Sequence, residues 1–246
     1  ITFKMLLTHV SGIKDNWSVM SYYNGDSELE LGYYLEEYLT PGGEFYGSNS
    51  NFTNSMPGTN YSYSNIGAAL IGYLVEEISN QSFNEYCNEN IFEPLEMDNA
   101  FWFLSEINNL NQVASPYQVT GGAGDSCYII GCGIYDESNP CFCDFACIDY
   151  EDCCSDYEEV CGEDGTGSSP GNLTEYEHYG YSDYPSGQLR TTSNNLAKFM
   201  SIYMNDGIYN DVIILESETI ELIKTIHYPL VNSMQGLMWY YKNQNG

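Results

Sequence analysis

The chain has 246 residues, of which 43% are hydrophobic and 15% aromatic, so it can bury the core of one large domain or two smaller ones. Its net charge of −29, from 35 acidic and six basic residues, disfavours binding to nucleic acid and to anionic membranes. No apolar run reaches the roughly 18 residues of a membrane span. Such acidity allows binding of cationic partners or calcium. The simpler interpretation is that the negative charge keeps a secreted protein soluble and monomeric.

The chain begins at Ile1 without an initiator Met or a signal-type segment, so we expect a processed product or part of a longer protein.

Helix signals are clear in the first hundred residues. Thr2 can cap a short helix over residues 3–8, and apolar residues at helical spacing predict a helix over 65–78. Ser82, with a Glu three residues later, is spaced as a capping box and predicts a helix that ends at Ile91.

The segment 120–172 differs from both flanks, because it is rich in Gly, Cys and Asp and lacks a periodic apolar pattern. Glycine-rich runs at 121–124 and 165–171 are typical of flexible linkers. We therefore predict a small domain, 120–172 with its linkers, inserted into a larger domain made of 1–119 and 173–246.

Eight of the nine cysteines lie between positions 127 and 161. An even number of cysteines in so short a segment, with little else to form a core, predicts a disulfide framework in which each bridge contributes about 2–4 kcal/mol. Zinc is the alternative, but an adjacent cysteine pair and the lack of histidine in the segment disfavour it. Spacing alone leaves roughly 100 pairings open. The eight are Cys127, Cys132, Cys141, Cys143, Cys147, Cys153, Cys154 and Cys161.

The runs CFCDFAC (141–147) and DCCSDY (152–157), followed by Cys161, resemble the cysteine pattern of a somatomedin B domain over about 40 residues. In that family the module often mediates protein–protein contact. Twelve acidic and no basic residues between Asp125 and Asp164 would suit a basic partner; the alternative is a rigid decoration that shields or shapes the host domain. The resemblance implies four disulfides, Cys127–Cys143, Cys132–Cys161, Cys141–Cys154 and Cys147–Cys153.

The ninth cysteine, Cys87, is expected to be a small buried hydrophobe, with a bridge to a cysteine outside this chain as the alternative.

Other features of the sequence concern the cell compartment. Five Asn-x-Ser/Thr sequons, together with the cysteine-rich segment, predict a secreted, extracellular or lumenal glycoprotein. The sequons are at Asn16, Asn51, Asn60, Asn80 and Asn172.

The last quarter of the chain returns to regular patterns. Ser193 and Ser217 are the expected N-caps of two helices, over 194–204, where Gly207 ends the helix, and over 218–226. The expected strands are 211–215 and 236–241.

Three stretches outside the cysteine-rich segment share one resemblance. They are ITFKMLLTHVSGI (1–13), the segment from Pro57 to Met97 with its YSN, and YPSGQLRTT with NLAKF (184–199). In this order they resemble the serine β-lactamase-like hydrolases, which include class C β-lactamases, D-alanyl-D-alanine carboxypeptidases and related esterases. The resemblance implies an α+β, β-lactamase/transpeptidase-like fold, of which this chain holds largely the helical part and is incomplete at both ends.

The triplet Tyr63-Ser64-Asn65 matches the family's Tyr-x-Asn motif at the head of a helix. The resemblance implies that Tyr63 shuttles a proton between nucleophile and leaving group, and that Asn65 positions the substrate carbonyl or the catalytic lysine. The alternative is that Ser64 or Asn65 only caps the helix, but a cap requires neither Tyr61 nor Tyr63.

The nucleophile of the family belongs to a Ser-x-x-Lys motif at the start of a buried helix. We expect this motif before Ile1, and the third motif of the family after Gly246. Ser11 and Lys14 have the same spacing, but a turn rather than an apolar helix follows them. We therefore reject Ser11 as the nucleophile, and with it a Ser11–His9 pair.

Two functions follow from these patterns. The first is a secreted serine hydrolase that transfers the acyl group of a small amide, ester or lactam without a cofactor or metal, with Tyr63 and Asn65 as catalytic residues and Gly187 near the pocket. The second is a catalytically inactive scaffold for protein interaction or assembly through the cysteine-rich module. The intact Tyr63-x-Asn65 favours the enzyme, and the scarcity of basic residues disfavours substrates that carry a carboxylate.

Overall fold

The computed structural model describes residues 1–120, 126–135, 141–144, 146–162 and 172–242. The chain divides into two compact units, one formed by Ile1–Leu110 with Tyr179–Gly246 and the other by Asn111–His178. The smaller unit is wider than the segment 120–172 predicted from composition, because paired strands flank the cysteines. The glycine-rich runs predicted to be linkers lie outside the described residues.

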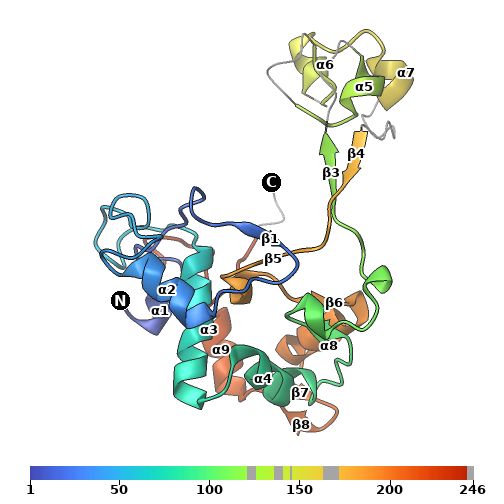
Figure 1. The fold of residues 1–246 in the computed structure, drawn as a ribbon. Helices are drawn as coiled ribbons and strands as arrows, with labels where there is room; N and C mark the ends of the chain where they lie inside the picture. The colour runs from blue at the N-terminus through green and yellow to red at the C-terminus, as the bar shows by residue number, and fades with distance from the viewer. Residues whose placement is uncertain (121–125, 136–140, 145, 163–171, 243–246) are drawn as a thin grey trace. The chain divides into compact units, whose positions relative to one another are not determined.

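The larger unit is mainly helical, with short two-stranded pairings between its loops (Figure 1). Its helices are α1 (Phe3–Leu7), α2 (Leu31–Leu39), α3 (Asn65–Ser79), α4 (Phe83–Cys87), α8 (Ser193–Met204) and α9 (Ser217–Lys224), with the π-helical turn η1 (Asn88–Phe92) and the 3₁₀ turns η2 (Leu104–Glu106) and η4 (Tyr184–Ser186). Its antiparallel pairs are β1 (Tyr22–Asn24) with β5 (Tyr179–Tyr181), β2 (Ala100–Phe101) with β6 (Arg190–Thr191), and β7 (Ile208–Tyr209) with β8 (Val212–Ile213). The 3₁₀ turn η3 (Leu110–Gln112) crosses the boundary between the two units.

Three of the predicted helix starts are confirmed by side-chain caps. Thr2 accepts a hydrogen bond from the Met5 amide, Ser64 accepts from the Gly67 amide, and Ser82 and Glu85 form both bonds of the capping box. The helix that follows Ser82 changes to a π-helical turn before it ends at Phe92, one residue later than expected.

Two predicted caps in the C-terminal part are wrong by one residue. The cap of α8 is Thr192, whose hydroxyl accepts from the Asn195 amide, so Ser193 is already helical. The cap of α9 is Glu216, which makes no side-chain cap bond. The cap is the residue whose backbone is extended just before the helix, and in both helices this is the residue that precedes the predicted serine. The serine hydroxyl in the sequence therefore did not identify the cap position.

The predicted strand over 236–241 is wrong. The segment forms a tight turn in which the Gly236 amide donates to the Trp239 carbonyl at 2.7 Å, with one isolated bridge between Gln235 and Tyr240. The strand predicted over 211–215 is shorter, because Asn210 and Asp211 both adopt positive φ and form the hairpin turn.

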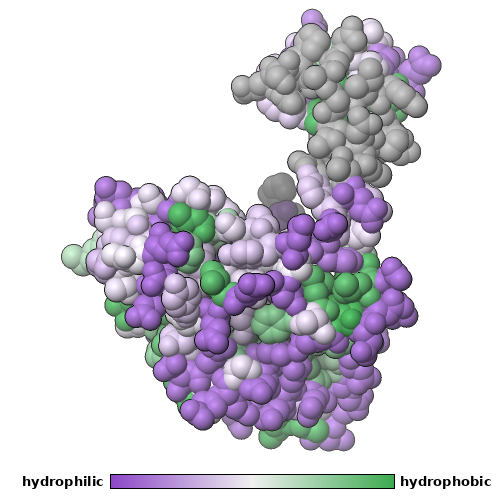
Figure 2. All heavy atoms as spheres, in the orientation of Figure 1, coloured by the Kyte–Doolittle hydropathy of each residue, from purple (hydrophilic) through white to green (hydrophobic). Residues whose placement is uncertain are grey.

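The core of the larger unit lies among α2, α3, η1 and the segment after η1. Tyr38, Ile66 and Leu95 have no exposed surface, and Phe83 and Trp102 contribute ring contacts at 5.2 Å. The face of this unit seen in Figure 2 is mostly hydrophilic, with only small hydrophobic patches. None of the described helices is long and apolar enough to span a membrane.

The smaller unit is organised around its disulfides. Its buried cluster contains five of the eight cysteines, together with Ile130 and Tyr157. The bridges are Cys127–Cys143, Cys132–Cys161, Cys141–Cys154 and Cys147–Cys153, the pairing that the somatomedin B resemblance implies. Its elements are β3 (Tyr117–Thr120), paired antiparallel with β4 (Asn172–Glu175), and α5 (Cys127–Ile130), α6 (Cys147–Tyr150) and α7 (Tyr157–Cys161).

Candidate active site

The N-terminus of α3 presents the Tyr-Ser-Asn triplet. Ser64 is the cap, since its backbone is extended and its buried hydroxyl accepts from the Gly67 amide at 2.9 Å. The cap interpretation is therefore right for Ser64, whereas Asn65 is the first helical residue. Tyr63 and Asn65, on either side of the cap, keep their side chains for other contacts.

Tyr63 and Asn65 contact one another. The Tyr63 hydroxyl donates to Asn65 Oδ1 at 3.1 Å, and Asn65 Nδ2 donates to Asp15 Oδ2 at 2.8 Å. Both polar atoms of the Asn65 amide are thereby oriented, while the Tyr63 side chain is 57% exposed and accessible to a substrate. The arrangement offers a phenol that can give or take a proton, held by a fixed amide.

Asp15 is a residue of this site that the sequence did not reveal. Its carboxylate accepts four hydrogen bonds, from the backbone amides of Asn65 and Ile66, the Ser64 hydroxyl and the Asn65 side chain, at 2.8–3.2 Å. A carboxylate at this position also interacts favourably with the helix dipole. Asp15 follows the rejected Ser-x-x-Lys spacing and is separated from α3 by fifty residues, so no local pattern indicates it.

His9 lies buried behind the triplet. Its Nδ1 accepts from the Ser64 amide at 3.3 Å, its backbone carbonyl accepts from the Ser62 amide, and its ring is 4.5 Å from that of Tyr63. Burial lowers the pKa of His9, and the nearby Asp15 carboxylate opposes this shift. His9 thus supports the triplet as a neutral hydrogen-bond acceptor.

The Ser11–Lys14 stretch lacks the geometry of a nucleophile motif. Ser11 is 3% exposed, and its Oγ accepts from the Ile13 amide at 3.2 Å. Ile13 forms a β-bridge with Phe52, and Lys14 donates its backbone amide to Asn51, so the stretch is extended rather than helical. In the described part of the chain no hydrogen bond joins Ser11 to His9.

A pocket of about 300 Å³ opens beside Tyr63 and Asn65, a volume at the lower end of small-molecule sites. Its wall is rich in aromatic rings from three separate segments of the larger unit. Asp183, almost fully buried, also lines it; burial raises the pKa of this carboxyl, and its Oδ2 accepts from the Ser186 hydroxyl at 3.0 Å. The lining residues are Trp17, Met20, Ser21, Tyr22, Tyr63, Asn65, Tyr179, Tyr181, Asp183, Ser186 and Gly187.

Gly187, expected near the pocket rather than in it, is part of its lining. Arg190, in the same segment, donates to the carbonyls of Gln188 and Tyr179. Cys87 is buried without a disulfide, as expected of a small hydrophobe, and burial raises the pKa of its thiol to about 11.

One of the five predicted glycosylation sites, Asn51, is buried in the folded chain. Asn51 has no exposed surface, and its Nδ2 donates to the carbonyls of Tyr38 and Phe45, so a glycan on that nitrogen would displace the core. Asn16 is half-buried, and its Nδ2 donates to Asn51 Oδ1. Asn60 and Asn80 are exposed, and the Asn172 side chain lies outside the described residues.

Metal binding finds no support in the cysteines. Among the described residues, the tight cluster of potential ligand atoms is formed by Cys127, Cys143 and Cys154, and all three sulfurs are in disulfides. A thiolate is needed to bind zinc, and a disulfide sulfur cannot supply one.

Comparison with solved structures shows the fold. Similar solved structures include the simvastatin synthase LovD from Aspergillus terreus, with a TM-score of 0.55 and 16% identity over 95% of this chain and 44% of that one. A penicillin-binding protein from Bacillus halodurans gives a TM-score of 0.52 with 18% identity over 92% of this chain and 51% of that one. The D-amino acid amidase from Ochrobactrum anthropi complexed with L-phenylalanine gives 0.51 with 15% identity, over 91% and 46%. The chain thus spans about half the length of these structures.

No curated protein matches the chain in a sequence comparison. A family model described as Beta-lactamase matches residues 1–226, which is most of the chain and includes the triplet, the pocket and the cysteine-rich unit. The expected α+β, β-lactamase/transpeptidase-like fold with a disulfide-rich insert is confirmed. The chain belongs to the β-lactamase family.

Proposed function

We propose that this protein is a serine hydrolase or acyltransferase that acts on a small amide, ester or lactam through an acyl-enzyme. The observation that carries the proposal is the bond between the Tyr63 hydroxyl and Asn65 beside the 300 Å³ pocket. The amidase and the LovD synthase among the structural neighbours support acyl chemistry for the fold. The nucleophilic serine and its lysine would come from outside residues 1–246.

In the proposed reaction the serine oxygen attacks the substrate carbonyl while its proton passes to the lysine. Tyr63 then delivers its proton to the leaving group as the bond to the carbonyl carbon breaks, and takes back a proton from the lysine. In the second half the same groups take a proton from water or another acceptor, which attacks the acyl carbon, and return it to the serine as the acyl group leaves. Asn65 Nδ2 carries two hydrogens, so one can donate to Asp15 while the other donates to the substrate oxygen. Its Oδ1, which accepts from Tyr63, has a second lone pair that can accept from the lysine.

We also propose that the cysteine-rich unit is a somatomedin B-like module of an extracellular or lumenal protein, and that its acidic surface binds a basic protein partner. Four disulfides support an oxidising compartment. Exposed Asn60 is the sequon best placed for a glycan.

The test uses the native, full-length protein and a fluorophosphonate or fluorescent penicillin probe, with the labelled peptide identified by mass spectrometry. We expect a labelled serine upstream of Ile1. Tyr63→Phe should slow labelling about 10²–10⁴-fold, because the proton shuttle is lost. Tyr61→Phe, which removes a hydroxyl 3.5 Å from Gln235 in the same cluster, is the matched control and should label at nearly the wild-type rate.

A label on Ser11 would contradict the assignment of the nucleophile. No labelling of the folded protein by either probe would favour the inactive scaffold, whose function would lie in the cysteine-rich unit.

A further inference from the structure

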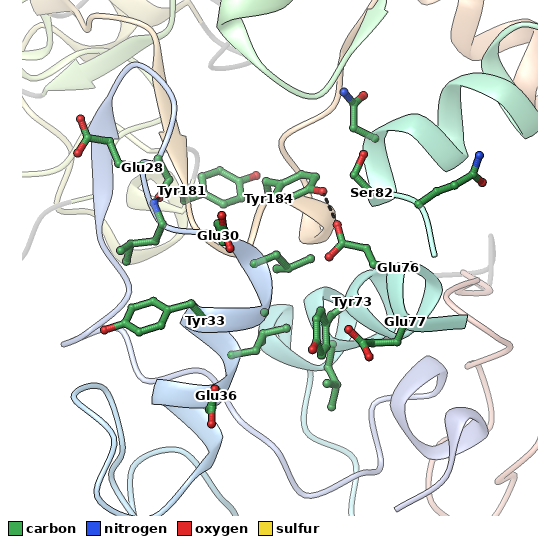
Figure 3. A pocket seen from close by; sticks show the side chains of 18 of the residues that line it. Glu28, Glu30, Tyr33, Glu36, Tyr73, Glu76, Glu77, Ser82, Tyr181 and Tyr184 are labelled. Carbon is green, nitrogen blue, oxygen red and sulfur yellow. Dashed lines mark hydrogen bonds between the residues drawn. The ribbon is translucent and has the colours of Figure 1, made fainter. Parts of the chain in front are cut away.

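A second and larger cavity lies on the larger unit, away from the triplet. Its volume is about 1190 Å³, which exceeds the usual range for small-molecule sites and suits a segment of polypeptide. Figure 3 shows it between α2, which contributes Tyr33 and Glu36, and α3, which contributes Tyr73 and Glu77. Tyr181 is the one side chain that lines both this groove and the active-site pocket.

The aromatic part of the groove depends on a glycine. A Cβ on Gly32 of α2 would lie 2.7 Å from the Tyr73 ring, so the ring rests against the helix only because position 32 has no side chain. Glycine inside a helix costs about 1 kcal/mol relative to alanine. Tyr33 adds a ring that is 48% exposed, and the Tyr184 hydroxyl donates to Glu76 at 3.3 Å on the far wall (Figure 3).

The charge of the groove is entirely negative. Six glutamates line it and, within this described lining, no lysine, arginine or histidine does. Three of the glutamates have local partners: Glu76 accepts from the Phe83 amide, Glu85 completes the capping box, and Glu77 is hydrogen-bonded to Tyr73.

The other three glutamates have none. Glu28, Glu30 and Glu36 are exposed, and among the described residues their carboxylates form no hydrogen bond or ion pair. The described chain has one ion pair, between Lys224 and Glu221, so its few cations do not neutralise this groove. Carboxylates gathered around aromatic rings match a partner that carries cationic heads on apolar stems, as lysine and arginine do.

We propose that this groove binds a basic segment of a partner protein. The lysine and arginine side chains of that segment pair with Glu28, Glu30 and Glu36. Its aliphatic groups pack on Tyr33 and Tyr73. The site is independent of the proposed acyl transfer, because it requires neither Tyr63 nor Asn65.

The test is fluorescence anisotropy of the full chain with the fluorescein-labelled peptide KRLKRLKRL at physiological salt. We expect saturable binding that Glu30→Gln with Glu36→Gln weakens about tenfold, a loss of about 1.4 kcal/mol. The matched control is Glu216→Gln with Glu218→Gln on α9, which removes the same charge. Glu30 and Glu216 are both N-cap residues without a side-chain cap bond, and all four glutamates are exposed.

The control pair should change the affinity by less than about twofold. Tyr33→Ser, which leaves the charge unchanged, should also weaken binding, since the ring supplies contact and cation–π energy. If the double variant in the groove and the double control variant on α9 lost the same affinity for the peptide, binding would reflect net charge alone and the proposal would be overturned. The lack of saturable binding, or binding that Tyr33→Ser does not affect, would also overturn it.

Discussion

At the scale of single residues, the geometry of the candidate site depends on side chains that the catalytic motif does not contain. Asp15 fixes the amide of Asn65 and the first turn of α3, and His9 holds the backbone of Ser64 from the buried side. A motif residue reaches a defined orientation only when such partners lock its rotamer. The effects of changing Asp15 and His9 can therefore be predicted from their bonds.

Asp15→Ala should destabilise the fold by about 1–3 kcal/mol, because four donors at the start of α3 lose their acceptor. It should also lower any acyl-transfer activity, since Asn65 becomes free to rotate. Urea unfolding followed by circular dichroism measures the first effect. Asp98→Ala, at an exposed acid that forms no bond among the described residues, is the control and should change the stability by less than about 0.5 kcal/mol.

Stability should fall as the pH drops from 7.5 to 5.5, partly through His9. Its folded pKa lies below the ordinary value of 6.5, so the unfolded state binds the proton more readily. The stabilisation that neutral His9 gives to the folded state is complete above the pKa that His9 has in the unfolded chain. It is lost as the pH falls through the lower pKa that His9 has in the folded protein. Unfolding of His9→Gln at both pH values should show a smaller loss than the wild type; an equal loss would assign the pH effect to other groups.

At the scale of elements, α3 is the axis on which the site is built. It packs on α1, α2, α4 and η4, and one of its glycines, Gly72, allows the close approach of a neighbour. At Gly72 an added Cβ would lie 2.7 Å from Pro185 of η4, the turn that leads to pocket residues Ser186 and Gly187. At Gly67 the nearest atoms would be 3.4 Å away, an ordinary contact.

Gly72→Ala should destabilise the protein by about 1–3 kcal/mol, because the overlap with Pro185 outweighs the gain in helix propensity. Gly67→Ala should be neutral or slightly stabilising. Thermal unfolding of the two variants side by side measures the difference. If both changed the midpoint alike, helix propensity rather than the contact with η4 would govern position 72.

Local patterns predicted the elements that carry their own start signals. The helices after Thr2, Ser64 and Ser82 begin where a side-chain cap meets apolar residues at helical spacing. No pattern indicated α2, whose cap residue, Glu30, makes no side-chain bond. The segment 236–241 has aromatic residues typical of a strand, but it pairs with no strand among the residues that the structure describes and folds as a turn.

At the scale of the whole molecule, two units rely on different sources of stability. The larger unit buries an apolar core, whereas four disulfides and few apolar side chains form the core of the smaller one. The free Cys87 of the larger unit is buried and forms no bridge.

Reduction of the folded protein should therefore affect the units differently. We expect dithiothreitol to abolish protection from hydrogen exchange in residues 127–161, because each lost bridge costs about 2–5 kcal/mol. Protection in α3 should stay within error of the oxidised protein, as measured by exchange coupled to mass spectrometry. Loss of protection in both units together would show that the larger unit depends on the bridges.

The sequence alone determined the family, the cysteine-rich insert and the Tyr63–Asn65 pair, because these are recorded in residue types at fixed spacing. Only the tertiary structure decided which distant groups meet. It placed Asp15 and His9 behind the triplet, brought Asp183 and Gly187 to the same pocket, and buried the sequon at Asn51. It also put three unpaired glutamates beside Tyr33 and Tyr73. Spacing along a chain specifies neighbours within a helix or strand, whereas contacts between elements depend on how their buried faces pack.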